Sequence, residues 1–222
     1  MGKNEICPET PHLILCEGAD AYFFLMWFLD FLKKVKKEFA AFRVYDFGGI
    51  KDLKPYLNTM IKTTDDFKSV VKSISIIRDA EKDAVAAAGS IKSTLQSLGF
   101  SVPQEPCIVV SGSDAYPQIP TGFVLFPTIS QTPENGTLED LCLRILSKTD
   151  AASRLTHADT ALEKYKDDLP QLHKNRLHAF FSMTDDLVSL KLGEAARCRA
   201  FNYDSSDMVS LKSFLEKMLE VK

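Results

Sequence analysis

Acidic side chains follow two apolar segments of the chain, at the point where each segment ends. Glu17 and Asp20 come directly after residues 12–16, and Asp79, Glu81 and Asp83 come after residues 70–77. If both segments are neighbouring strands of a parallel sheet, their carboxyl ends meet at one edge, where ligands bind in such sheets. Carboxylates held close together repel one another unless a hard cation lies between them. The pattern therefore indicates a site for Mg²⁺ or Mn²⁺, ions that bind substrate phosphates.

The same acidic residues have a purely structural interpretation. Asp and Glu are common at the N-termini of helices, where they accept backbone N–H groups and complement the helix dipole. Asp20 and Asp79 are placed to cap helices, and Asp83 falls in a predicted first turn. The spacing alone leaves both the capping and the metal-binding interpretations open.

The elements that must position these residues alternate between strand and helix. Short apolar runs predict strands at 12–16, 42–47, 70–77, 107–110 and 122–126, and helical spacing falls at 20–39, from 53 to 61, at 82–98 and at 137–147. Strands connected by helices of this length form a mostly parallel sheet with helices on both faces. The sequence predicts an α/β fold, with an open, mostly parallel sheet flanked by helices.

The chain changes character near residue 150. Residues 9–150 carry all the strand signals, whereas 151–222 read as helices and turns, with breaks at Pro170, Gly193 and 202–204. No flexible, low-complexity linker separates the two parts. We therefore expect an α/β core at 9–150 and a helical C-terminal extension at 151–222 that packs on it.

These motifs together resemble the Toprim domain of topoisomerases, bacterial primases and overcoming-lysogenization-defect (OLD) nucleases. The resemblance rests on strand-Glu17-Gly18-x-Asp20 and strand-Asp79-x-Glu81-x-Asp83, and on the stretch 135–140, which is similar to a Gly-x-Leu-Glu helix start. The C-terminal stretch 174–219 is similar to small stand-alone prokaryotic Toprim proteins related to the OLD type. One departure is clear: this chain has Asp79-Ala-Glu81 where the family has Asp-x-Asp.

The resemblance implies Mg²⁺- or Mn²⁺-dependent cleavage of a phosphodiester in nucleic acid, DNA or RNA. Glu17 would act as general acid or base, and Lys174 on a downstream helix would stabilise charge on the phosphate. The metal ligands would come from Glu17, Asp20, Asp79, Glu81, Asp83, Glu139 and Asp140. Glu81 is one methylene longer than the family's Asp, so either the geometry shifts or Asp83 substitutes.

A basic segment is the best candidate for contact with a nucleic-acid backbone. Residues 31–62 hold eight Lys or Arg against three acids, including Lys33, Lys34, Lys36 and Lys37. A solvated helix face is the alternative interpretation. The whole chain has a net charge of −3, so no bulk positive field attracts nucleic acid, and binding would depend on this local patch.

Other function classes are disfavoured by missing motifs. The five cysteines form no Cys-x-x-Cys pair, which argues against zinc and disulfides and favours a reducing, cytoplasmic location. The most apolar stretch, residues 21–29, is too short to span a membrane. There is no Walker lysine and no Gly-x-Ser-x-Gly elbow.

Two alternatives to the nuclease stay open. A catalytically silent Toprim fold would act as a binding module, with a possible protein partner. A haloacid-dehalogenase-type phosphatase with Asp79 as nucleophile is weaker, because its Asp-x-Asp should follow the first strand. The oligomeric state is open.

Overall fold

A five-stranded sheet forms the centre of the protein. The computed structural model describes residues 9–220, and the strand order across the sheet is β2-β1-β3-β5-β4. All neighbouring pairs are parallel except β4 and β5, which are antiparallel. The strands are β1 (His12–Cys16), β2 (Phe42–Asp46), β3 (Ser73–Asp79), β4 (Val109–Val110) and β5 (Thr121–Phe126). The predicted α/β fold is confirmed.

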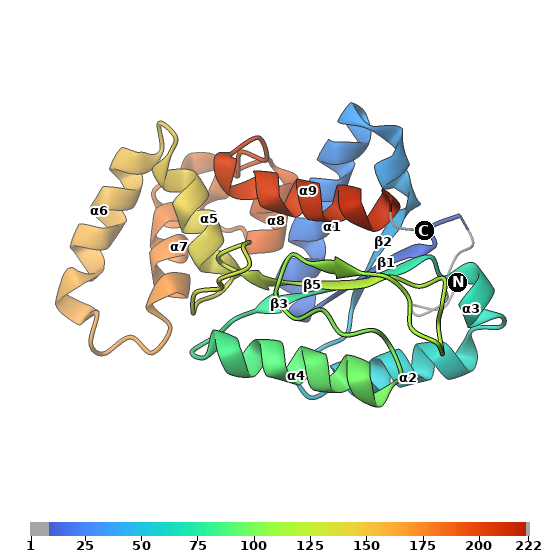
Figure 1. The fold of residues 1–222 in the computed structure, drawn as a ribbon. Helices are drawn as coiled ribbons and strands as arrows, with labels where there is room; N and C mark the ends of the chain where they lie inside the picture. Colours follow the sequence, from blue (N-terminus) through green and yellow to red (C-terminus); the bar gives the residue numbers. More distant parts are fainter. Residues whose placement is uncertain (1–8, 221–222) are drawn as a thin grey trace.

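Helices cover both faces of the sheet, as Figure 1 shows. The helices are α1 (Gly18–Val35), α2 (Leu53–Thr63), α3 (Phe67–Val70), α4 (Ala84–Ser97), α5 (Leu138–Ser147), α6 (Ala152–Leu162), α7 (Leu172–Ser182), α8 (Leu192–Arg197) and α9 (Val209–Glu220), with short 3₁₀ helices at Lys37–Ala41, Glu163–Tyr165, Asp185–Leu187 and Ser206–Met208. Helices α2, α3 and α4 bury apolar side chains against one face, and α1, α5, α8 and α9 cover the other. The central strands are buried on both faces, which explains the apolar runs in β1 and β5 and the isoleucines of β3.

The C-terminal helices share a hydrophobic core with the N-terminal part of the chain. One cluster contains Phe24 and Phe28 of α1 together with Phe181 of α7 and Phe214 of α9. Helix α8 lies so close to α1 that a Cβ on Gly193 would be 2.6 Å from the Cβ of Phe23. Side chains of α7, α8 and α9 therefore pack in the same cluster as those of α1.

The only tryptophan of the sequence lies at the contact between α1 and α8. The Arg197 guanidinium is 5.9 Å from the ring centroid of Trp27, a cation–π arrangement. Trp27 also packs, half-buried, against the cluster that joins α1 to the C-terminal helices.

Several element boundaries differ from the prediction. Strand β3 covers Ser73–Asp79 rather than 70–77, because Val70 ends helix α3. Helix α1 ends at Val35, Lys36 is extended, and a 3₁₀ helix follows at Lys37–Ala41, so the predicted helix 20–39 is too long. The fourth strand has two residues instead of four. The predicted break at Gly193 is wrong, because this residue lies inside α8, where α1 leaves no room for a side chain.

The thiols of Cys16, Cys107, Cys142 and Cys198 are free, and Cys7 lies outside the described residues. Across residues 9–220, no helix combines the length and the apolar character needed to cross a membrane.

Candidate metal centre

The sheet brings the two predicted acidic segments to the same edge. Cys16, the last residue of β1, is paired with Asp46 of β2 on one side and with Ile77 of β3 on the other. The next residue, Glu17, donates its backbone N–H to the Ile77 carbonyl at 3.2 Å. Glu17 and Asp79 therefore lie at the carboxyl edge of neighbouring strands, where the sequence predicted them to converge.

Glu17 is paired with a buried arginine that no sequence motif singled out. Arg78, in β3, is 2% exposed, and its Nε lies 3.0 Å from Oε2 of Glu17. Neither atom has an aligned hydrogen-bond partner among the described residues. Burial raises the pKa of Glu17, Arg78 opposes this shift, and the charges of Glu81 and Asp46 add to it.

Asp79 has the most perturbed carboxyl group of the cluster. Burial raises its pKa to about 8, and the charges of Glu139, Glu81 and Glu17 act in the same direction. One interaction favours the ionised form: Asp79 accepts a hydrogen bond at 2.8 Å from the backbone N–H of Leu138, the first residue of α5. Asp79 thus caps α5 rather than the helix that follows its own strand.

Glu81 occupies a strained position beside this cluster. Its φ is +57°, in the left-handed region that non-glycine residues seldom adopt. Two backbone hydrogen bonds to Gly136, at 2.8 and 2.7 Å, clamp the loop after β3 to the loop before α5. Such strain persists only where the surroundings impose it, and it often marks functional sites. The side chain of Glu81 is exposed.

The predicted residues of α5 and α7 also reach the cluster. Glu139 is buried, and Nζ of Lys174 lies 3.5 Å from its Oε1. Lys174 itself is exposed on the first turn of α7. The sheet edge, α5 and α7 thus bring Glu17, Asp79, Glu139 and Lys174 into one region.

The remaining acidic candidates cap helices or are exposed to solvent. Asp83 is the N-cap of α4 and accepts the Ala86 N–H at 2.9 Å. Asp140 forms a capping box with Thr137 at the start of α5. Asp20 is exposed in the first turn of α1, and no side-chain hydrogen bond caps that helix. Capping competes with metal binding for the carboxylates of Asp83 and Asp140.

Two further polar residues make structural contacts at this edge. Asp46 ends β2 and accepts hydrogen bonds from the N–H groups of Gly18 and Gly48, at 2.9 and 2.8 Å. Asn135 connects two loops: its Oδ1 accepts from Ala84 N–H, and its amide donates to the Lys82 carbonyl. Asp46 carries the signal of an acid at a strand end, whereas Asn135 carries none.

The four predicted nucleic-acid-binding lysines are not near the acidic cluster. Lys33, Lys34 and Lys37 are exposed and Lys36 is half-buried, all at the C-terminal end of α1 or just after it. Glu17 precedes the other end of this 18-residue helix, which is about 27 Å long. Lys34 also pairs with Asp30 at 3.4 Å.

The carboxylates are not prearranged around an ion. Within the described part of the chain, no three His, Cys, Asp or Glu side chains are grouped as a ready-made metal site. Arg78 contacts Oε2 of Glu17 and Lys174 contacts Oε1 of Glu139, so a cation bound at this edge would compete with these two ion pairs.

Comparisons with known proteins place the chain in one family. Neither the curated proteins nor the solved structures contain a match to this sequence. The model of a family described as "Protein of unknown function (DUF3226)" matches residues 11–220, nearly the whole chain. The protein is therefore a member of the DUF3226 family.

Proposed function

We propose that this protein is a Mg²⁺- or Mn²⁺-dependent phosphodiester hydrolase of the Toprim type that acts on nucleic acid. The observation that carries the proposal is the meeting of Glu17, Asp79 and Glu139 from three separate elements, with the pKa of Asp79 raised to about 8. Strongly perturbed carboxyl groups at the ligand edge of a sheet are typical of functional sites.

The chemistry of these side chains fits a hard divalent cation. Every acidic group of the cluster offers carboxylate oxygen, the ligand that Mg²⁺ and Mn²⁺ prefer. The buried Oε2 of Glu17 lacks an aligned hydrogen-bond partner among the described residues, so a bound cation could satisfy this oxygen in place of Arg78. Glu17, Asp79 and Glu81 would hold the ion, with Glu139 at a second position. When bound, the ion would neutralise phosphate charge and lower the pKa of a coordinated water.

The chain's own residues would supply proton transfer and charge stabilisation. Burial raises the pKa of Glu17, which makes its carboxylate a stronger proton acceptor. Lys174 cannot bind a cation, but its exposed ammonium group can leave Glu139 and donate to a phosphate oxygen. Lys33, Lys34, Lys36 and Lys37 would contact the nucleic-acid backbone at a distance from the site.

Cleavage of labelled single- and double-stranded DNA and RNA, with Mg²⁺ or Mn²⁺, tests the proposal. Asp79→Ala should abolish cleavage, and Lys174→Ala should slow it about a hundredfold while leaving metal binding intact. Asp83→Ala is the matched control: it removes an N-cap, costs about 1 kcal/mol of stability, and should leave cleavage unchanged. Replacing the four lysines together with Gln should weaken binding and flatten its salt dependence.

A second candidate function is a catalytically silent binding module of the same fold. Its supporting observation is that Arg78 pairs with Glu17 and Lys174 with Glu139, so internal cations already neutralise part of the cluster. A metal site predicts a stabilisation of about 2.7 kcal/mol when Mg²⁺ is at 100 times its Kd. Thermal unfolding that is identical with and without millimolar Mg²⁺, together with no cleavage, would favour the silent module and a search for a nucleic-acid or protein partner.

A further inference from the structure

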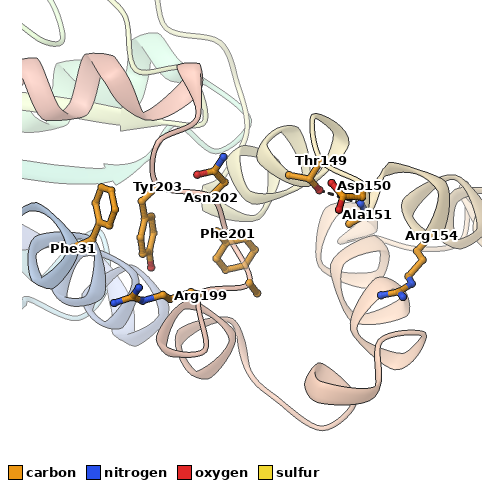
Figure 2. A pocket seen from close by; sticks show the side chains of 10 residues that line it. Phe31, Thr149, Asp150, Ala151, Arg154, Arg199, Phe201, Asn202 and Tyr203 are labelled. Atoms are coloured by element: carbon orange, nitrogen blue, oxygen red, sulfur yellow. Dashed lines mark hydrogen bonds between the residues drawn. The ribbon is translucent and has the colours of Figure 1, made fainter.

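A second candidate binding site lies far from the carboxylates. A pocket of about 560 Å³ is bounded by the last turns of α1, the junction of α5 and α6, and the turn at 199–203 after α8. Both α1 and α5 begin at the acidic edge and end at this pocket, so the length of each helix separates the two sites. Figure 2 shows the lining side chains.

Two arginines without a partner line the pocket on opposite sides. Arg154 comes from α6 and Arg199 from the turn after α8, and both are exposed. Within residues 9–220, neither guanidinium takes part in an ion pair or a hydrogen bond. Asp150 is the one acidic residue among the described lining residues, and it pairs with neither arginine. The lining is therefore net positive.

The backbone holds Arg199 in an unusual conformation. Its φ is +59°, in the left-handed region, and its N–H donates to the Ala196 carbonyl at 3.1 Å. A glycine or asparagine would adopt this conformation at lower cost. An arginine at a strained position on a pocket wall suggests a task beyond forming the turn.

Aromatic side chains and a free amide complete the pocket. The rings of Phe31 and Tyr203 are 5.7 Å apart, and Phe31 is partly exposed. Tyr203 donates its hydroxyl to the Ala196 carbonyl, so its oxygen is directed into the protein. The side chain of Asn202 accepts a hydrogen bond from Asp204, and its NH₂ group has no partner among the described residues. Donors and an apolar ring thus face the same space.

We propose that this pocket binds a nucleoside polyphosphate. Its volume lies within the range of pockets for organic ligands and exceeds what a lone phosphate would fill. Arginine forks match phosphate oxygens, and an aromatic face such as Phe31 supports a base by stacking. The base would lie against Phe31 near the Asn202 amide, with the phosphates toward Arg199 and Arg154. This inference does not depend on the proposed hydrolase activity.

Isothermal titration calorimetry in EDTA tests the proposal without any contribution of a bound divalent cation. ATP should bind, and adenosine and tripolyphosphate should each bind more weakly than ATP, because each lacks one half of the contacts. Arg154→Gln and Arg199→Gln should each weaken ATP binding about tenfold or more, since each removes a charged hydrogen-bond donor. Phe31→Leu should weaken ATP and leave tripolyphosphate unchanged.

Two control variants make the result specific. Lys62→Gln removes an exposed cation from α2 on the other face of the sheet and should bind ATP like the wild type. Asp79→Asn, which tests the acidic cluster, should also leave ATP binding intact, so failure of one site is distinguishable from failure of the other. The proposal is overturned if ATP at millimolar concentration gives no binding, if neither arginine variant weakens it, or if tripolyphosphate binds as tightly as ATP.

Discussion

Among single residues, Arg78 has the environment that most affects the candidate metal centre. Its guanidinium is almost fully buried at the end of a central strand and lies beside Glu17. A buried charge is tolerated only when another charge compensates it. Arg78 therefore neutralises part of the negative charge of the cluster, and a cation bound by Glu17 would compete with this ion pair.

Disrupting this pair from either side should be costly. Arg78→Met and Glu17→Gln should each lower the free energy of unfolding by about 3 kcal/mol, because each leaves one charge buried without its partner. The double variant should be less destabilised than the sum of the two single variants. Urea denaturation of the four proteins measures the coupling, and additive effects would show that the two charges act independently.

The pH dependence of stability should depend on Asp79. Its pKa in the folded protein is about 8, whereas an unfolded Asp titrates near 4, so the folded state retains a proton in this window that the unfolded state has released. The stabilising contribution is thus present below about pH 4 and is lost as the pH rises through about 8. We expect Asp79→Asn to be more stable than the wild type by several kcal/mol at about pH 9 and nearly equal at low pH. Chemical denaturation of both proteins across this pH range measures the difference in their free energies of unfolding. A difference that stays the same at every pH would contradict the raised pKa of Asp79.

The acidic part of the site was predictable because it follows a local rule. An acid directly after an apolar strand can be read from the chain, and this rule located Glu17 and Asp79 at one edge. Arg78 was not predicted because the strand was expected to end at residue 77, two residues before its observed end, which would have placed this cation in the loop. The capping roles of Asp83 and Asp140 were also not separable from metal binding, since both tasks select the same residue type at the same place.

Among the elements, α8 can pack closely against α1 only because residue 193 has no side chain. Gly193→Ala would place a Cβ 2.6 Å from the Cβ of Phe23, so α8 must shift away from α1. We expect this variant to be destabilised by about 1–3 kcal/mol. Gly89→Ala is the matched control: Gly89 is an exposed helical glycine in α4, a methyl group there would meet nothing within 4 Å, and alanine should stabilise the protein by about 0.5–1 kcal/mol. Equal thermal shifts in both variants would show that the close contact is unimportant.

The element boundaries that were missed share a physical cause. Val70 and Val71 are apolar and β-branched, so they read as strand, yet Val70 ends a one-turn helix that buries Phe67. Gly193 reads as a helix breaker, yet packing against α1 outweighs its low helix propensity. In each case a contact with a residue distant in sequence decides the local structure, and no local pattern contains it.

At the scale of the whole molecule, the division at residue 150 marks a change of composition but not an independent folding unit. Side chains from both sides of this point belong to one hydrophobic cluster, which includes Phe24, Leu141, Phe181 and Phe214. The order of the elements and the two-sided sheet were predictable from periodicity. Which face each C-terminal helix covers was not, because an amphipathic helix does not specify its partner.

Removing residues 151–222 should therefore prevent folding of the rest. The truncated chain would expose the apolar face of α1 and the face of the sheet that α9 covers. We expect it to aggregate or to lack a cooperative thermal transition, measured by circular dichroism and size-exclusion chromatography. A soluble fragment with a sharp transition would show that 9–150 folds independently.

The indole of Trp27 is an intrinsic fluorescent probe. Because the sequence has one tryptophan, all emission excited at the red edge of its absorption comes from the surface between α1 and α8. That surface joins the first helix of the chain to a helix near its end. Fluorescence and far-ultraviolet circular dichroism should lose signal together if the protein unfolds in a single step. An earlier change in fluorescence would instead record the C-terminal helices separating from α1 while the sheet is still folded.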